Sequence, residues 1–371
     1  MFESAADERP KLRTAGPGKP LPWTQGELLN INEKEGQMRR QSLAPVSMLA
    51  VVLGLAWLIP APLMAQAASS LRTAWGDPDL QGTFTNKTIT PFERPTEFAE
   101  KEFLTVEEAA ELEQIRSAEN AARDDEEPAD IVGNYNTHWF DRGTTVVATR
   151  RSSIIIDPPD GMLPSLTPEA KMKAPSPEEV RRLRAARRGT GLIDTWEDLD
   201  LNDRCILWPN AGPPMLSSAY NNNYQIFQTP EYVAIFIEMI HDFRIIPLDG
   251  RPHVGQGLRQ WLGDARGHWE GDTLVVETTN FSDKTVIRAA NNAKPTEALR
   301  LVERFRRVDA DTIEYRFTIE DPKTWTRPWT GEVPWVKIKD GLYEYGCHEG
   351  NYSMPTMLTG SRNSEAAAES K

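Results

Sequence analysis

The stretch Thr312-Ile-Glu-Tyr-Arg-Phe-Thr-Ile-Glu320 decides the fold class, because apolar and polar side chains alternate along it without a break. Alternation with a period of two places the apolar side chains on one face of a β-strand and the polar ones on the other. The turn Asp309-Ala-Asp311 joins this stretch to a preceding strand over 299–308, so the two form an antiparallel hairpin. The stretch therefore predicts a sheet with one buried face and one solvated face.

Three more hairpins with short turns are expected along the chain. They pair residues 224–229 with 232–246, residues 267–269 with 273–279, and residues 329–338 with 342–347. Consecutive hairpins favour a meander that closes on itself or curves strongly. We therefore predict a mostly β protein, an antiparallel β barrel or strongly curved, calycin-like meander sheet with a few peripheral helices.

The β pattern occupies residues 220–360, which we interpret as the antiparallel β core. Residues 68–219 are expected to hold N-terminal strands, loops and two helices packed on the barrel. The helices begin at two capping boxes, Thr105-Val-Glu-Glu108 and Ser176-Pro-Glu-Glu179. Further strands are expected at 80–85, 144–150 and 153–156. The polar residues 361–371 are predicted to be a disordered tail.

The N-terminal part of the chain carries the pattern of a secretory signal peptide. Arg39 and Arg40 precede an apolar run from Met48 to Ile59, and Ala65-Gln66-Ala67 is a small-x-small cleavage pattern. The run is too short to span a bilayer comfortably, and a buried core helix is the alternative. We expect a signal peptide over 38–67 behind a mis-assigned leader that starts before the true first residue, Met38. The mature protein is then periplasmic or secreted, with no stable membrane anchor.

Charge and cysteine content restrict the partners and the compartment. The formal net charge of −13 repels phosphate backbones, so nucleic acid is not an expected partner. The two cysteines, Cys205 and Cys347, most simply form one disulfide in an oxidising compartment. A metal pair and two free thiols are the alternatives.

Five stretches of the chain occur together in a known set of sequences. They are Ile154-Ile-Ile-Asp-Pro-Pro-Asp-Gly161, Arg259-Gln-Trp-Leu-Gly-Asp264, Trp269-Glu-Gly-Asp-Thr-Leu-Val-Val-Glu-Thr-Thr-Asn-Phe281, Glu320-Asp-Pro-Lys-Thr-Trp-Thr-Arg-Pro-Trp329 and Tyr343-Glu-Tyr-Gly-Cys-His-Glu-Gly-Asn-Tyr352. Together they resemble a large, mostly uncharacterised family of exported bacterial proteins. The resemblance covers most of the mature chain, roughly residues 75–360. It implies export and a β fold, and it carries no catalytic role to any residue.

Familiar catalytic and cofactor motifs do not occur in the sequence. There is no P-loop, no dinucleotide fingerprint and no flavin motif, and the cofactor is therefore unknown, with a divalent metal as one option. Ser217 and Ser218 have no histidine nearby in sequence, which disfavours a serine hydrolase.

Aromatic residues supply the candidates for ligand binding. Trp325 and Trp329 lie in a Pro-flanked segment and are the tryptophans most expected to be exposed as stacking platforms. Trp261, Tyr224 and Arg244 complete the candidate set for a small-molecule ligand. Packing in the barrel interior is the alternative role for the rings.

Glu303 is a carboxylate on the apolar face of a predicted strand, the face it shares with Leu301 and Phe305. Such a group either forms an ion pair or has a raised pKa. It is therefore either a general base in a cavity or one half of a structural ion pair with an arginine from a neighbouring strand.

The main candidate active site is the set His241, His348, Glu349 and Glu238. His241 ends a long apolar strand, and His348-Glu349 follows the last predicted strand directly after Cys347. If the two strand ends share one barrel mouth, imidazole and carboxylate meet there for acid–base catalysis. His241, His348 and Glu238 also have the types of a two-histidine, one-carboxylate metal site. Glu238 and His241 are three residues apart, so a regular strand would place them on opposite faces.

The sequence leaves three classes of function open. The first is an exported enzyme that uses histidine and carboxylate acid–base or metal-assisted chemistry on a small apolar, aromatic or glycosidic molecule. The second is a non-catalytic periplasmic ligand-binding β barrel, and the third is a structural or interaction protein of the envelope. Convergent histidine and carboxylate groups would favour an enzyme, and an exposed apolar patch would favour an interaction protein. The oligomeric state is left open.

Overall fold

The computed structural model describes residues 71–125, 140–141, 143–187, 191–212, 214–287 and 294–370. The chain divides into two units, Met1–Pro60 and Ala61–Lys371, and every described residue belongs to the second. The predicted leader and signal peptide lie outside the described residues. No helix in the described ranges has the length and apolar character needed to cross a membrane.

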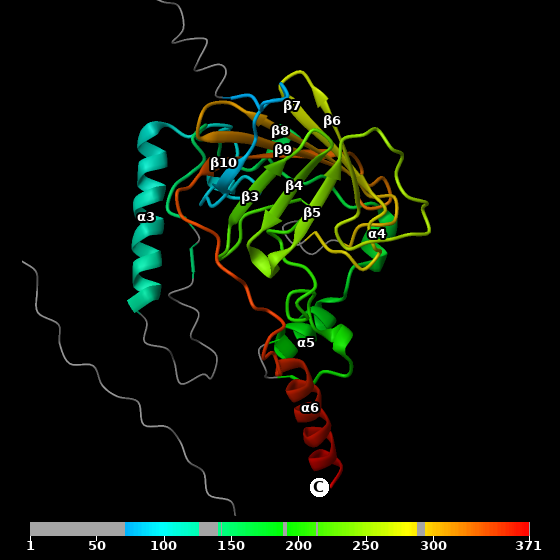
Figure 1. The fold of residues 1–371 in the computed structure, drawn as a ribbon. Coiled ribbons are helices and arrows are strands. Elements are labelled where there is room, and N and C mark those ends of the chain that lie inside the picture. Colours follow the sequence, from blue (N-terminus) through cyan, green and yellow to red (C-terminus); the bar gives the residue numbers. More distant parts are fainter. Residues whose placement is uncertain are drawn as a thin grey trace, which may run out of the picture. The chain divides into compact units, whose positions relative to one another are not determined.

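The second unit consists of a curved sheet and a few helices (Figure 1). Its strands are β1 (Gly82–Thr85), β2 (Ile155–Asp157), β3 (Asn223–Gln228), β4 (Tyr232–Ile237), β5 (Phe243–Pro247), β6 (Asp264–Glu270), β7 (Thr273–Thr279), β8 (Arg300–Arg307), β9 (Thr312–Glu320) and β10 (Trp329–Lys337). Its helices are α3 (Val106–Asp125), α4 (Pro168–Lys173), α5 (Pro177–Arg187) and α6 (Ser353–Glu369), with single 3-10 turns η1 (Thr96–Phe98), η3 (Trp196–Asp198) and η4 (Met239–His241).

The strands form one antiparallel sheet in the order β5-β4-β3-β1-β10-β9-β8-β7-β6, and β2 pairs with β10 beside this path. The two ends of the order come close together, because the backbone of Gly267 in β6 packs against the side chain of Ile246 in β5. A Cβ atom at Gly267 would lie 2.7 Å from Ile246 Cγ2, so only glycine fits there. The sheet is therefore a nearly closed barrel, and the predicted fold class is confirmed.

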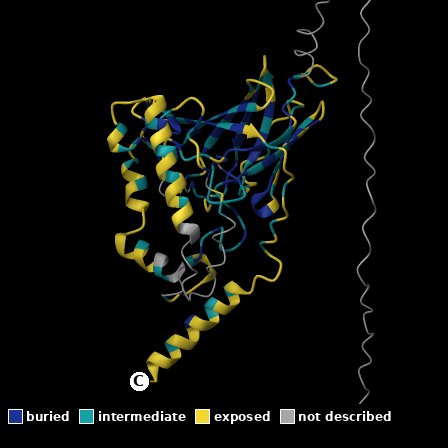
Figure 2. Cartoon of the chain, turned by 90° about the vertical axis from the view of Figure 1, so that its left-hand side faces the viewer, coloured by how far each residue is buried: buried dark blue, intermediate teal, exposed yellow. Residues whose placement is uncertain are grey.

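The interior of the barrel is filled by the inward-facing side chains of alternate residues. Ile313, Tyr315, Phe317 and Ile319 are all buried, as the alternation in β9 predicts. Figure 2 shows buried residues gathered in the strands and exposed residues along the helices. The core consists of ring-to-ring and aliphatic packing between the facing walls of the barrel, which is the main source of stability in such a fold.

Two predicted strands differ from the structure. Residues 342–347 form no strand, because both edges of β10 are already in use. One edge of β10 pairs with β9 along its whole length, and the other pairs with β1 and β2. Residues 144–150 form turns and extended loop in place of a strand.

The predicted long strand over 232–246 is two strands, β4 and β5, which pair with each other as a tight antiparallel hairpin. The turn η4 separates them, and its residues Ile240 and His241 have φ values of 60° and 47°. Left-handed backbone at these two residues cannot continue a strand. The chain therefore reverses direction inside what reads in sequence as one apolar run.

Residues 361–369 of the predicted disordered C-terminal tail belong to helix α6. Met354, Met357 and Leu358 pack against the buried Ile193 and Leu199. Ser361 is buried as well, and its Oγ accepts a hydrogen bond from the backbone N–H of Ile193 at 3.0 Å. These contacts give the segment a partner that its polar composition does not indicate.

Candidate functional site

The turn between β4 and β5 holds two of the predicted site residues in a strained backbone. Left-handed φ at a β-branched residue such as Ile240 costs about 1–3 kcal/mol and is found where the surrounding structure enforces it. Here the backbone N–H of Ile237 donates to Asp242 O at 2.8 Å, and that of His241 donates to Glu238 O at 3.2 Å. Burial of Ile240 offsets part of the strain. The turn places His241 and Asp242 at the end of the hairpin.

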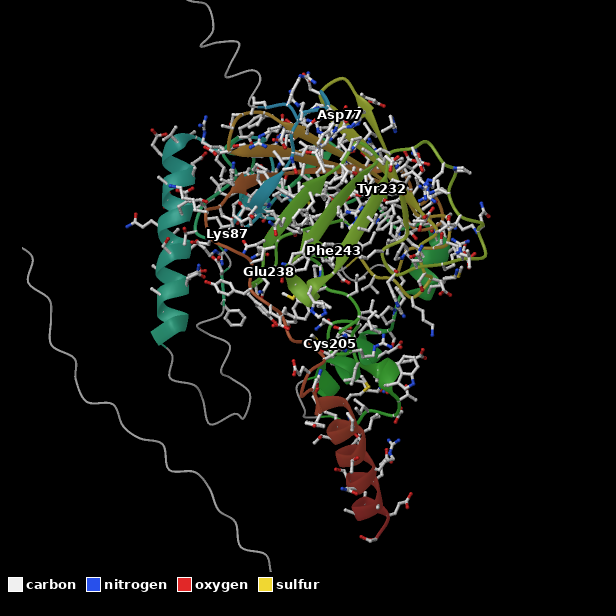
Figure 3. All side chains as sticks on the ribbon, in the orientation of Figure 1. Asp77, Lys87, Cys205, Tyr232, Glu238 and Phe243 are labelled. Carbon is white, nitrogen blue, oxygen red and sulfur yellow. A yellow bond between two sulfur atoms is a disulfide. The ribbon has the colours of Figure 1, made fainter. Side chains whose placement is uncertain are left out.

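A second segment, residues 343–348, lies against this turn. The Cys205–Cys347 disulfide, with an S–S bond of 2.01 Å, ties the segment to residues 201–208, and the predicted pairing is confirmed. The backbone N–H of Tyr343 donates to Glu238 Oε1 at 2.9 Å. Figure 3 labels Glu238 and Phe243 at the lower end of the β4–β5 hairpin, with Cys205 below them. The disulfide and this hydrogen bond bring His348 to the same end of the barrel as His241.

His241 has a defined tautomer in its neutral form. Its Nδ1 lies 2.9 Å from the carbonyl oxygen of Tyr345. Because a carbonyl oxygen only accepts hydrogen bonds, Nδ1 carries the hydrogen, and Nε2 is left with the basic lone pair. The His241 side chain is exposed, so Nε2 is available to a small molecule from solvent.

Asp242 is the most unusual group at this end of the barrel. Its side chain is half-buried, and its Oδ2 atom is buried without a hydrogen-bond partner in the described part of the chain. Burial raises the pKa of the Asp242 carboxyl from 3.8 to about 6, while the nearby His241 and His348 act to lower it. The two predicted histidines therefore act on one carboxylate, and that carboxylate titrates close to neutral pH.

Glu238 has a structural role beside this group. Its Oε2 accepts a hydrogen bond from Asn223 Nδ2 at 2.7 Å, and its Oε1 accepts the one from Tyr343. The side chain is buried, and burial raises the pKa of its carboxyl. Oε1 thus ties residue 343 to the β4–β5 turn, and Oε2 ties the same carboxylate to Asn223 at the start of β3.

The described residues do not contain a group of three or more histidine, cysteine, aspartate or glutamate side chains arranged to hold a metal ion. The predicted metal ligands His241, His348 and Glu238 therefore do not form such a group, and the two oxygens of Glu238 accept hydrogen bonds from Asn223 and Tyr343. Glu349 and His348 are exposed.

The interior carboxylate Glu303 is fully buried and fully paired. Arg244 donates to it from both terminal nitrogens, with Nη1 to Oε1 at 2.8 Å. Tyr315 OH donates to the same Oε1 at 2.8 Å, and burial raises the pKa of this phenol well above its usual value. Glu303 is thus a structural ion pair and not a general base. An arginine from a neighbouring strand was predicted as its partner. Arg244 instead lies on β5, which is not adjacent to β8 in the sheet.

The predicted ligand-binding residues are mostly part of the core. Arg244 is held by Glu303, and Tyr224 stacks on Trp335 with ring centroids 4.2 Å apart. Tyr224 OH donates to Asn210 O at 3.0 Å and accepts from Asn86 Nδ2 at 3.1 Å. Both side chains are buried.

The expected exposure of Trp325 and Trp329 is wrong, since they are 2% and 0% exposed. They pack edge to face against each other at 5.7 Å, and Trp329 packs in the same way on Phe317. Edge-to-face packing places both rings in the core, so neither is an exposed stacking platform, although Trp325 contributes to the lining of a pocket. Trp261 is half-buried and packs against the same core.

The sequence reasoning missed Asp242. Its signal was a second polar residue directly after His241, at the end of a strand rich in apolar residues. Residues 232–246 read as one continuous strand, because the turn at residues 239–241 contains no glycine or proline to mark it. Asp242 was therefore not predicted as a site residue.

Comparison with known proteins gives no matching family model and no matching curated protein. The resemblance to the exported bacterial family therefore stays a prediction.

Proposed function

We propose that this protein is an exported enzyme that performs acid–base chemistry on a small molecule at the end of the barrel. The observation that carries the proposal is the unpartnered Oδ2 of Asp242, a half-buried carboxyl with a pKa of about 6 that is influenced by the charges of His241 and His348. Perturbed titratable groups held in a strained turn are characteristic of active sites.

The protonation state of the Asp242 carboxyl decides whether it can act as the base. Above pH 6 the Asp242 carboxylate is ionised, and its free oxygen can accept a proton from a bound substrate. His241 offers Nε2 as a second proton site, fixed in direction by the hydrogen bond of Nδ1 to Tyr345. The Asp242 carboxylate removes a proton from the substrate, and the protonated imidazolium form of His241 or His348 returns one.

Aromatic side chains next to His241 support a small aromatic or apolar substrate. The ring of Tyr345 stacks on Tyr220 at 6.3 Å, and Tyr220 contacts Trp208 and Phe140, each at 5.8 Å. Such rings bind apolar and aromatic groups through area burial and stacking. The disulfide supports the exported half of the proposal, because such bonds persist in oxidising compartments.

A panel of 4-nitrophenyl esters and glycosides tests the proposal, with release of 4-nitrophenolate as the readout across pH 4–9. Turnover should follow an apparent pKa near 6 and fall at least 100-fold in Asp242→Asn. Asp249→Asn is the matched control, since Asp249 is an exposed aspartate seven positions further along the chain. Turnover that is equal in Asp242→Asn and the wild type would refute the assignment of Asp242.

An interaction role in the envelope is the second candidate. The outward face of β3 carries Phe227, and that of β5 carries Phe243 and Ile245; these side chains are 43%, 54% and 54% exposed. Phe236 stacks on Phe243 at 4.6 Å and extends this apolar patch. Exposed patches of this kind mark interaction surfaces. If Phe243→Ser abolishes sedimentation with envelope fractions while the panel shows no turnover, this second role replaces the first.

A further inference from the structure

A pocket of about 670 Å³ lies beside helix α4, within the range typical of small-molecule sites. Its walls come from residues 163–166, from α4 and the residues after it, and from the segments 294–297 and 323–325. None of His241, Asp242 and His348 lines it. The pocket is therefore separate from the acid–base site, and ligand binding in it does not depend on the proposed function.

The walls of this pocket are held in place by hydrogen bonds between distant segments. Thr167 N–H donates to Thr324 O, and Thr326 N–H donates to Ser165 O, both at 3.0 Å. The buried Asp321 accepts from Thr296 Oγ1 at 2.9 Å and from Thr324 Oγ1 at 2.8 Å. These bonds fix three of the lining segments, 163–166, 294–297 and 323–325, to one another. A site with walls fixed before binding loses less entropy when a ligand enters.

One part of the lining is apolar. It contains Leu163, Pro164, Leu166, Pro295 and the buried Trp325. Leu166 and Trp325 form a bridge between their backbones, so these two side chains belong to one continuous wall. Such a wall suits aliphatic or aromatic side chains of a ligand.

Four carboxylates and three lysines line the pocket, and some of them already form ion pairs. Lys173 pairs with Glu169 at 2.7 Å, and Arg259 pairs with Glu297 at 3.3 Å. Lys294 and Lys323 form no ion pair within the described ranges, and neither does Asp283. Glu93 is the remaining carboxylate, and its Oε1 accepts a hydrogen bond from Leu163 N–H at 2.9 Å.

From this composition we infer that the pocket binds a small zwitterion with an apolar body, the size of a dipeptide. The ligand carboxylate would pair with Lys294 and Lys323, and the ligand ammonium with Asp283 and Glu93. A ligand that carried only a carboxylate would leave Asp283 and Glu93 without a counter-charge. A ligand that carried only an ammonium would leave Lys294 and Lys323 without one. The apolar side chains of the ligand would contact Leu166 and Trp325.

Isothermal titration with three matched probes tests this inference. The probes are L-leucyl-L-phenylalanine, its N-acetyl derivative, which lacks the ammonium, and its C-terminal amide, which lacks the carboxylate. We expect the free dipeptide to bind and each blocked form to bind about ten-fold more weakly, because each loses charge-assisted hydrogen bonds. Failure of the free dipeptide to bind, or equal binding of a blocked form, would overturn the inference.

Variants assign the charges to residues. Lys323→Gln should weaken the free dipeptide about ten-fold and leave the amide unchanged, and Asp283→Asn should weaken it without affecting the N-acetyl form. Lys171→Gln is the matched control, because Lys171 is an exposed lysine of α4 that does not line the pocket. An effect of Lys171→Gln equal to that of Lys323→Gln would contradict a specific site. Turnover of the 4-nitrophenyl panel should not change in these variants, so failure here is distinguishable from failure of the proposed function.

Discussion

Two carboxylates in this protein show how differently a fold can treat buried charge. Glu303 lies inside the barrel and is matched by the guanidinium of Arg244 and the hydroxyl of Tyr315. Asp242 lies at the end of the barrel, and its buried Oδ2 has no partner within the described residues. The charge of Glu303 is paired within the core. The ionised form of Asp242 is destabilised by burial. A matched buried charge therefore indicates structure, and an unmatched one in a strained turn indicates chemistry.

The largest effect on stability should come from removing the Cys205–Cys347 disulfide, which holds residues 343–348 at the same end of the barrel as Asp242. Replacing Cys205 by Ser opens a loop of 142 residues, and the chain-entropy model gives a loss of about 4–5 kcal/mol in the free energy of unfolding. The loss should appear in urea unfolding under oxidising conditions only. An equal loss with a reducing agent present would mean that Cys205 acts through packing.

Breaking the matched pair should destabilise nearly as much. Glu303→Leu leaves Arg244 buried without its counter-charge, and such a loss typically costs about 3–5 kcal/mol. The double variant with Arg244→Met should recover much of this, because it removes both charges from the core. Urea midpoints of the two single variants and the double variant give the coupling. Additive losses would show that the two side chains do not depend on each other.

Removing the unmatched charge should have the opposite sign. Burial raises the pKa of Asp242 from 3.8 to about 6, so the folded state binds this proton more tightly than the unfolded state. Stability conferred by that proton is complete below pH 4, falls as the pH rises to 6, and is absent above. At pH 7.5, Asp242→Asn should therefore stabilise the protein by about 2 kcal/mol after an allowance for solvent screening. At pH 3.5 the variant and the wild type should have equal urea midpoints, and a destabilised variant at pH 7.5 would contradict the account.

The two carboxylates also differ in how far the sequence predicts them. Alternation in β9 and the inward position of Glu303 are consequences of the strand period, so the barrel and the buried carboxylate could be predicted. The pairing of Cys205 with Cys347 could be predicted from their number alone. The first two features follow from the alternation of side chains along single strands, and the third follows from the number of cysteines.

The candidate site at the β4–β5 turn could not be predicted from the alternation of apolar and polar residues. Nothing between Glu238 and Asp242 has the composition of a turn, and the left-handed φ of Ile240 is imposed by tertiary packing. Residues 343–345 alternate like a strand, but the edges of β10 are taken by strands that are distant in sequence. The burial of Trp329 depends on partners such as Phe317 that only the folded barrel supplies.

Burial of the Asp242 carboxyl is expected to make it titrate near neutral pH. The most direct measurement is an NMR titration of the aspartate carboxyl carbons between pH 3 and 8, with Asp242→Asn to assign the resonance. We expect a pKa of about 6 for Asp242. A pKa at or below about 4, the ordinary value for an exposed aspartate, would contradict it.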